Sequence, residues 1–462
     1  MRLLSFGHAA LLVDTGTERI LLDPWLTDRL DRFWERWPAL PAGLRSELSG
    51  DLDAIVLSHH HYDHHHFPSL AGLAADQEAD FDETVARRED IRVFYPRPPA
   101  VPPRFTASGL GHQAIGWTLR RLGFTDAQGV TPGETIRIGR TTIRTLPSRV
   151  PFPEMSLLIE GPDATVVVCG DSLLHPDVTD FFAGPGAPRV DLAFVPTHSA
   201  SPAGVLTERR QVRDAQEVVG RSTATFLRWC DTLSPAAVVP SSFGWRVAST
   251  VPGQYDWANR TIFPLTVVQA AAAWRARGGT ALLCGAGQLV DVAAGQAAVS
   301  NSEHLPAGHD FEALCAEVTF RPDTPVPDLD PRTDSVGKLR ESPDVLADRL
   351  CEQLVGTDFW YRAAESGQTH ALEIATEDGD HVRILDLANQ RTFPAGPGAL
   401  GSGGGFTRIA GATLQALDDA ELLFGSSYGL WVSNDNLLSA VYHHPRYYVR
   451  HVEAALRAGV PA

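Results

Sequence analysis

The chain has 462 residues, more than one typical domain, so its length favours two domains. Hydrophobic residues make up 44% of it and charged residues 21%, an ordinary balance for a globular protein with a core of normal size. The formal net charge of −17 and the lack of a basic stripe argue against nucleic acid as a partner. We therefore expect a globular protein that acts on a small molecule, either free or carrier-bound.

The cysteines and the first residues bear on the compartment. The five cysteines are scattered, with no CxxC or close pair, so neither a disulfide framework nor a zinc ribbon is indicated. A reducing, cytoplasmic compartment is the simplest interpretation. The opening MRLLSFGHAALLVDTG lacks a long apolar core and a small-residue cleavage site, which favours a first strand over a signal peptide. No apolar run reaches membrane-spanning length, so we expect no membrane partner.

Short apolar runs bounded by turn residues predict β-strands through the first 290 residues. The expected strands cover 3–6, 10–13, 19–23, 54–58, 91–95, 134–138, 141–146, 156–160, 164–171, 192–196, 236–240 and 280–285. The TGTE run at 15–18 is typical of a hairpin turn, and helices are expected at 112–123 and 267–278. A β-rich start followed by strands alternating with helices indicates an α/β sandwich of mixed sheets.

The composition changes near residue 300. A polar, proline-rich segment at 301–334 reads as a connector. Beyond it, 370–387 is a plausible hairpin, while 346–355 and 447–459 have helical periodicity. We therefore predict two domains, one over 1–300 and a smaller α+β domain over 301–462. The second is expected to shape the substrate cleft or to hold a homodimer.

The run LSHHHYDHHHF at 57–67 carries the chemistry. Within it, His59-x-His61-x-Asp63-His64 has the spacing of a two-metal site. His59 and His61, two residues apart, can project together onto one metal, while Asp63 and His64 leave the turn toward a second. By chance this pattern arises on the order of once in a thousand chains of this length. Its position directly after the buried run AIVLS argues against chance.

HxHxDH is the signature of the metallo-β-lactamase superfamily, which residues 1–290 resemble. The resemblance implies an αββα sandwich, here followed by the smaller C-terminal α+β domain. It places Asp23, at the end of RILLD, as a support for the metal loop. Gly7-His8 is similar to the branch with lactonases and N-acyl phospholipid hydrolases. We expect His8 to be an active-site residue held by hydrogen bonds rather than a metal ligand.

The resemblance also implies three further ligands: a third histidine, an aspartate that bridges the metals, and a last histidine. Asp171, in ATVVVCGDS, fits the bridge, and His198, in DLAFVPTHS, fits the last ligand. A turn residue and an ordinary loop histidine are the alternatives for these two. Where the third histidine should lie, the chain has none and offers Glu154 instead. A solvated loop glutamate is the alternative there.

Pro151-Phe152-Pro153-Glu154 resembles the segment in which the diiron β-hydroxylase of chloramphenicol biosynthesis and its relatives replace that histidine by glutamate. In that group the metal domain follows a large N-terminal domain, whereas this chain begins with it. Imidazole-rich sites suit zinc, while carboxylate-rich sites favour iron. The resemblance implies a ligand set of His59, His61 and Glu154 at one iron, Asp63, His64 and His198 at the other, and Asp171 between them.

We therefore expect a non-heme diiron oxygenase that uses O₂ and an external electron-transfer partner to hydroxylate or oxidise a small substrate. Glu154 and Asp171 are the residues expected to be central to catalysis. The alternative is a hydrolase with two zinc or manganese ions, acting on an ester, lactone, amide or phosphodiester. The remaining histidines of the run (His60, His65 and His66) are expected to be bystanders or supports of the ligands.

Overall fold

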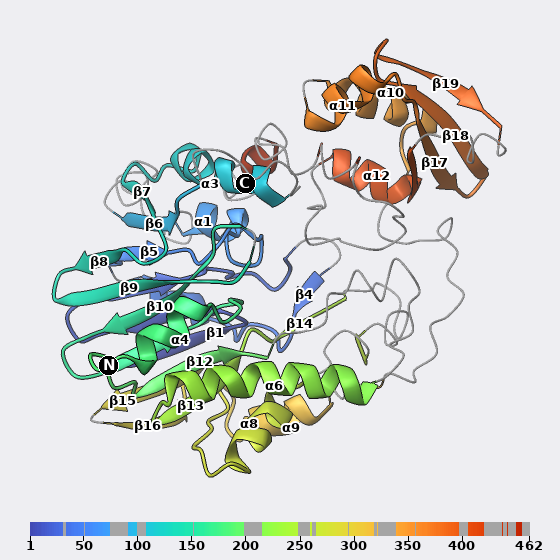
Figure 1. Ribbon diagram of the computed structural model, residues 1–462. Helices are drawn as coiled ribbons and strands as arrows, with labels where there is room; N and C mark the ends of the chain where they lie inside the picture. The colour runs from blue at the N-terminus through green and yellow to red at the C-terminus, as the bar shows by residue number, and fades with distance from the viewer. Residues whose placement is uncertain are drawn as a thin grey trace.

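The N-terminal part of the chain consists of two β-sheets packed face to face, with helices on both outer faces (Figure 1). The computed structural model describes residues 1–30, 34–49, 51–73, 91–98, 108–150, 152–197, 215–247, 259–260, 265–293, 295–317, 321, 339–355, 357–396, 405–419, 437, 441 and 450–454. This arrangement confirms the predicted αββα sandwich.

The first sheet has eight strands, in the order β16-β15-β1-β2-β3-β5-β6-β7. They are β16 (Gln296–Asn301), β15 (Gln288–Ala293), β1 (Arg2–Gly7), β2 (Ala10–Asp14), β3 (Arg19–Leu22), β5 (Ala54–Val56), β6 (Arg92–Pro96) and β7 (Ala127–Val130). Pairing is antiparallel from β16 to β3 and parallel from β3 to β7. The expected TGTE turn joins β2 to β3, where Thr15 N donates to Glu18 O.

The second sheet has six strands, in the order β13-β12-β11-β10-β9-β8. They are β13 (Ala237–Ser241), β12 (Leu192–Pro196), β11 (Thr165–Val168), β10 (Met155–Glu160), β9 (Thr141–Pro147) and β8 (Thr135–Ile138). The strand expected at 280–285 is reduced to one bridge, between Ala281 and Val238. Helix and turn residues precede it up to Gly278, so only a short stretch lies alongside β13.

Three apolar clusters explain the layers. The cluster between the sheets joins β-branched and leucine side chains of both, such as Ile20 and Val166. On the outer face of the first sheet lie α1 (Phe67–Gly72) and α3 (Ser108–Arg121), and on that of the second lie α4 (Pro176–Ala183), α6 (Ala215–Leu233) and α8 (Val267–Arg275). Leu70 and Ile115 pack on the first sheet, and Trp229 on the second.

Short elements border the sandwich. The strands β4 (Trp34–Arg36) and β14 (Trp245–Val247) pair with each other, and η1 (Leu44–Leu48) is a single 3₁₀ segment. Within the expected connector, α9 (Phe311–Glu317) forms a helix that lies on α8. Phe311 is buried, and its ring lies where a side chain on Gly285 would have to go. The domain boundary expected at residue 300 stays a prediction.

The C-terminal part has its own four-stranded sheet, in the order β19-β18-β17-β20 (orange in Figure 1). Its elements are α10 (Pro343–Leu354), α11 (Asp358–Ser366), β17 (His370–Thr376), β18 (Gly379–Asp386), β19 (Arg391–Ala395), β20 (Gly405–Ala410) and α12 (Gly411–Asp418). The hairpin expected at 370–387 is β17 and β18. Residues 450–454 are helical, and there Arg450 donates to Asp418 while Glu453 lies 3.8 Å from Arg121 of α3.

Candidate metal centre

Polar side chains gather at the edge of the sandwich where several strands of both sheets end. His8 follows β1, Asp23 follows β3, His59 follows β5 and Asp171 follows β11. Glu154 precedes β10, which runs antiparallel to β11, so it lies at the same edge. Four of these five residues thus follow the C-terminal ends of buried strands. Functional residues commonly lie on such loops, which a rigid scaffold holds in place.

The metal loop, residues 57–66, is a tight turn between β5 and α1. His64 N and His65 N both donate to His61 O, which closes the turn. His66 ends the loop as the N-cap of α1, with its ring accepting from Ser69 N. The cap fixes where the helix begins and therefore how the preceding residues are presented.

His59 and His61 form the first half of the site. Nε2 of His59 and Nδ1 of His61 lie 2.8 Å apart. Two ligands of one first-row metal lie within about 4 Å of each other, because each metal–nitrogen bond is about 2.0–2.1 Å. The phenyl ring of Phe152 lies 5.2 Å from the ring of His61 and stacks on that of His59 at 6.3 Å. Phe152 thus shields this pair of imidazoles.

The second half of the site consists of Asp63, His64 and Asp171, joined by His8. Nε2 of His64 lies 3.7 Å from Asp63 Oδ2 and 3.3 Å from Asp171 Oδ2. Nε2 of His8 lies 2.9 Å from Asp63 Oδ2. One ligand atom from each of these four residues falls within 4.8 Å of the others, the arrangement of a group that could hold a metal ion.

Asp23 supports both halves. Its carboxylate accepts from Ser58 N at 2.7 Å and from Ser58 Oγ at 2.6 Å, and Oδ2 lies 2.8 Å from His64 Nδ1. The serine hydroxyl also lies 3.0 Å from His59 Nδ1. Because Nδ1 of His64 is engaged by a carboxylate, its Nε2 is the nitrogen directed at the site, as in metal-ligating histidines. Asp23 adopts φ 42°, an uncommon conformation for a residue with a side chain.

Glu154 is buried at this edge, with its side chain 2% exposed. Ser148 Oγ donates to Oε2 at 2.5 Å, and Oε1 lies 3.6 Å from His59 Nδ1. A solvated loop glutamate would be exposed, so the structure excludes that alternative. The nitrogen that Glu154 approaches is the one opposite the Nε2 that faces His61.

The carboxylates at the metal edge favour binding of a cation. Asp23, Asp63, Glu154 and Asp171 crowd together, and no described Lys or Arg pairs with any of them. Burial raises the pKa of Glu154 to about 7. Burial alone would raise the pKa of Asp63 and of Asp171, but the adjacent His64 outweighs it and lowers the pKa of both carboxyl groups. Their negative charges in turn raise the pKa of His64, although burial acts in the opposite direction. A divalent ion would relieve this crowding.

Three ring nitrogens at the site test whether a metal fits. Nε2 of His64 and both nitrogens of His8 are buried and make no hydrogen bond among the described residues. Buried polar atoms without partners are costly and uncommon in folded proteins. Nε2 of His8 and Nε2 of His64 border carboxylate oxygens of Asp63 and Asp171, so the donor set fits a metal ion.

The other predicted residues have separate outcomes. His198 lies outside the described residues. His65 Nε2 lies 3.1 Å from Thr118 Oγ1 of α3, and burial lowers the pKa of His65 and of the cap His66 to about 3. These two histidines are neutral structural residues. His60 is buried beside Phe152, with ring centroids 5.4 Å apart.

Sequence reasoning missed the serines that support the site. Ser58 and Ser148 contact the histidines and Glu154 as described above, and Ser242 Oγ donates to Gly170 O, next to Asp171. Each follows or ends a strand at the ligand edge, which is the signal that could have found them. A serine there has many structural explanations, so the local sequence does not single it out.

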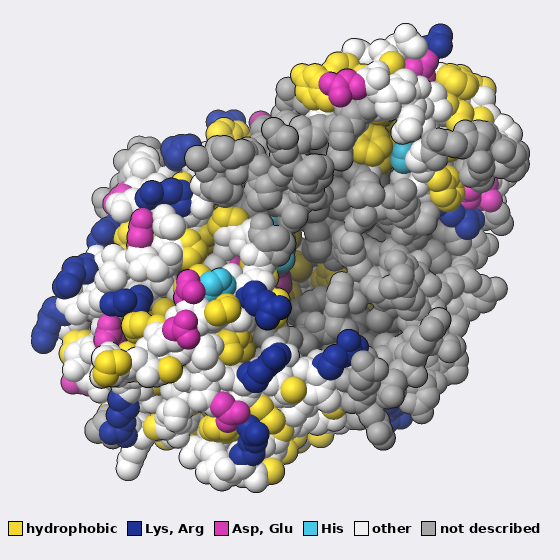
Figure 2. All heavy atoms as spheres, in the orientation of Figure 1, with side chains coloured by type: hydrophobic (Ala, Val, Ile, Leu, Met, Phe, Trp, Pro, Cys, Tyr) yellow, Lys and Arg dark blue, Asp and Glu magenta, His cyan; other side chains and the backbone are white. Residues whose placement is uncertain are grey.

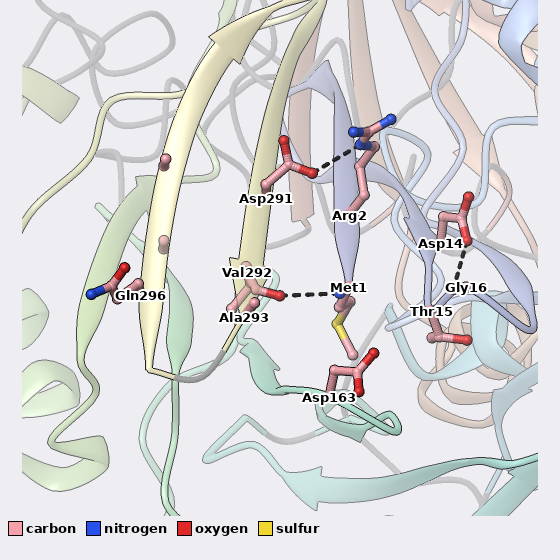
Figure 3. A pocket seen from close by; sticks show the side chains of 12 residues that line it. Met1, Arg2, Asp14, Thr15, Gly16, Asp163, Asp291, Val292, Ala293 and Gln296 are labelled. Atoms are coloured by element: carbon pink, nitrogen blue, oxygen red, sulfur yellow. Dashed lines mark hydrogen bonds and ion pairs between the residues drawn. The ribbon is translucent and has the colours of Figure 1, made fainter.

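One cavity bordered by described residues lies at the opposite end of the sandwich from the metal edge. It measures about 550 Å³ and is lined by Met1 and Arg2, by the turn after β2, by Asp14 and Asp163, and by residues of β15 and β16 (Figure 3). Arg2 begins β1, whereas His8 follows its end, so about 20 Å of strand separates this cavity from the metal edge. It is not part of the candidate site.

Comparison with known proteins agrees with this fold. Residues 18–241 match the model of the β-lactamase superfamily domain, a segment that runs from the start of β3 to the end of β13 and includes the metal loop. This part of the chain thus matches the β-lactamase superfamily domain, and the sandwich of two sheets described above has the arrangement of the metallo-β-lactamase fold. Its His/Asp cluster could hold metal, and the superfamily includes dinuclear sites.

Named relatives include both hydrolases and a hydroxylase. A metal-dependent hydrolase of Pyrobaculum arsenaticum is 33% identical over 64 residues, 14% of this chain. The match spans only 24% of that relative's length, and the same holds for a second one from Pyrobaculum aerophilum. Shared activity does not follow from so short a segment.

Solved structures with a similar fold include a diiron β-hydroxylase, CmlA, from Streptomyces venezuelae. That likeness has 19% identity and a TM-score of 0.38, covering 65% of this chain and 54% of that one. An isothiocyanate hydrolase from Delia radicum gut bacteria has 15% identity and a TM-score of 0.39, and the likeness covers 64% of this chain and 100% of that one. A metallo hydrolase from Ignicoccus hospitalis has 16% sequence identity and a TM-score of 0.37, and the likeness covers 65% of this chain and 99% of that one.

Two surface observations complete the description. Within the described part of the chain, no helix is long and apolar enough to cross a membrane. On the face shown in Figure 2, Lys and Arg side chains are dispersed over the sandwich, with acidic and apolar ones between them. No basic patch is visible there that would suit a polyanion.

Proposed function

We propose that this protein is a non-heme diiron oxygenase that uses O₂ and an external electron donor to hydroxylate or oxidise a small organic substrate. The observation that carries the proposal is Glu154. A buried glutamate lies at the ligand edge where members of this superfamily have a histidine, and the described residues from Pro147 to Met155 include no histidine. A carboxylate-rich donor set favours iron and its higher oxidation states.

In this proposal His59, His61 and Glu154 hold one iron, Asp63, His64 and His198 hold the other, and Asp171 bridges. The irons would supply the redox chemistry of O₂ activation, which zinc lacks. The described residues would fix the geometry and keep water out. Asp23 and Ser58 orient the imidazoles, Ser148 holds Oε2 of Glu154, and Phe152 covers the pair His59 and His61.

A metal-dependent hydrolase is the second candidate, and one observation favours it. Oε1 of Glu154 approaches Nδ1 of His59, not the Nε2 that faces His61. In that position Glu154 would orient His59 from behind, leaving an imidazole-rich site that suits zinc or manganese. Such a site would activate water toward an ester, lactone, amide or phosphodiester.

Metal analysis separates the two candidates. We expect protein from iron-supplemented cells to contain about two iron ions per chain, with a near-ultraviolet or visible ferric band. Glu154→Ala should lose about half of this iron, whereas Glu160→Ala, at the far end of the same strand, should keep all of it. Stoichiometric zinc in the wild type, or full iron in Glu154→Ala, would remove the case for an oxygenase.

A further inference from the structure

The turn after β1 directs His8 into the metal edge. Pairing of β1 with β2 shifts register between Ser5 and Gly7, and both Gly7 and His8 have positive φ, 84° and 53°. A histidine in this left-handed region is uncommon, and such conformations persist where the surrounding structure imposes them, often at functional sites. The result is a His8 side chain only 2% exposed, although it belongs to a turn.

His8 faces ligands rather than ordinary hydrogen-bond partners. Its ring meets the ring of His64 edge-on, with centroids 5.1 Å apart, and that of Trp25 at 5.9 Å. Nε2 is 2.9 Å from Asp63 Oδ2, yet neither ring nitrogen makes a hydrogen bond of acceptable geometry among the described residues. The sequence-based expectation of a hydrogen-bonded His8 is therefore not met.

We propose that His8 is a direct ligand of the second metal and shares one ion with Asp63, His64 and Asp171. This rests on the dinuclear site proposed above, but it holds for iron, zinc or manganese alike. It adds a nitrogen ligand from the first strand of the fold to a half-site otherwise built by the metal loop and the strands after it.

Distances and charge support this assignment. Three of the separations between donor atoms in the group are 2.9, 3.3 and 3.7 Å, within the roughly 4 Å that ligands of one first-row metal can span, and one donor atom from each of the four residues lies within 4.8 Å of the others. Two carboxylates and two neutral imidazoles balance a divalent charge. The ion would also satisfy both buried nitrogens, Nε2 of His8 and Nε2 of His64, that lack partners.

A small cavity beside His8 also supports its role as a ligand. His8 borders a cavity of about 20 Å³ that Ser5 and Ser241 also line. A cavity of this size and polarity can hold one water molecule. Metal-ligating histidines usually donate from their second nitrogen to a carboxylate, a carbonyl or water, and a water molecule in this cavity would lie beside His8.

Cobalt titration tests the assignment without relying on activity. Metal-free wild-type protein should bind about two equivalents of Co²⁺, observed by its visible bands. His8→Asn should keep one site and bind the second ion at least tenfold more weakly, since even indirect supports of a ligand change affinity by about 10–100-fold. Asn tolerates the left-handed backbone, and His8→Gln is a second variant should the first not fold.

Proton NMR of the Co²⁺ protein counts ligating histidines through their shifted, exchangeable ring N–H signals. The His8 variants should lose one such signal, and His381→Asn, an exposed position on β18, should lose none. Two tight equivalents and an unchanged signal count in folded His8 variants would overturn the His8 assignment alone. A wild type that binds no metal would overturn the proposed function as well, and zinc in place of iron would overturn only the oxygenase.

Discussion

Two clusters of buried polar side chains lie at opposite ends of the sandwich, and they differ in whether their buried polar atoms all have hydrogen-bond partners. Glu18, in the β2–β3 turn, is 6% exposed and accepts hydrogen bonds from the hydroxyls of Thr15, Thr17 and Thr141 and from Arg140 N. At the metal edge, four carboxylates lie close together, and two of them, Asp63 and Asp171, approach ring nitrogens of His8 and His64 that have no hydrogen-bond partner among the described residues. One cluster is complete without any ligand; the other is not.

This difference separates a structural from a functional use of buried charge. Glu18 ties the β2–β3 turn of one sheet to the β8–β9 turn of the other, and Gly139 leaves room for its carboxylate, which a Cβ there would meet at 2.2 Å. Its hydrogen bonds make burial tolerable. At the metal edge the ring nitrogens and carboxylate oxygens instead face one another, an arrangement that a cation between them would stabilise.

The largest effect is expected at Asp23, which belongs to the metal edge but is not itself a predicted ligand. Asp23→Asn should weaken metal affinity by about 10–100-fold, because the amide no longer orients His64 as a carboxylate does. Competition with a chromophoric chelator measures this, with Asp291→Asn as the exposed control. Equal affinities in the variant and the wild type would show that the edge does not depend on this support.

Glu18→Gln should change stability and leave metal content intact. Burial favours the neutral acid, but the four hydrogen bonds outweigh it and lower the pKa of Glu18 from about 4.5 to about 2. Ionised Glu18 therefore stabilises the fold above about pH 4.5, and this contribution is lost as the pH falls toward 2. Replacing it should cost about 1–3 kcal/mol at pH 7.

Urea unfolding at a series of pH values checks this prediction. The difference in the free energy of unfolding between wild type and Glu18→Gln should be largest near neutral pH and should decrease as the solution is acidified below about pH 4.5. A gap that stays constant across this window would mean that the hydrogen-bonded carboxylate is not the source of the difference. Reduced metal content in the variant would contradict the separation of the two clusters.

The smallest effect is expected from an exposed ion pair at the same end as Glu18. Arg2 Nε donates to Asp291 at 2.9 Å, with side chains 59% and 52% exposed (Figure 3). Exposed pairs contribute about 0–1 kcal/mol, so Arg2→Gln should lower the free energy of unfolding by less than about 1 kcal/mol. A loss as large as that of Glu18→Gln would show that burial does not distinguish them.

Much of the sandwich follows from the sequence, because its strands are apolar and its turns are marked. The long helix α6 and the β15–β16 hairpin were not anticipated. Residues 296–301 (QAAVSN) include only one β-branched residue, Val299, and β16 is a strand because it pairs with β15, which in turn pairs with β1. Tertiary pairing of that kind leaves no local signal.

The candidate site divides in the same way. The spacing of His59 to His64 is local, so the motif could be found by reading the chain. The place of His8 depends on β1, β3 and β5 ending at the same edge of one sheet, although His8 and the metal loop lie about fifty residues apart in the chain, and sequence spacing does not encode it. Glu154 could be located from the sequence. Which nitrogen of His59 it approaches depends on side-chain geometry, which the sequence does not show.

One contact between the two sheets links the site to folding. Met155 N donates to Ser58 O, so the two sheets are joined at the point where Ser58 also holds Asp23. The candidate ligands come from segments that meet only when the sandwich has closed. An unfolded chain cannot present them together, so any bound ion favours the native state. At a free concentration one hundred times its dissociation constant, such an ion would add about 2.7 kcal/mol to stability.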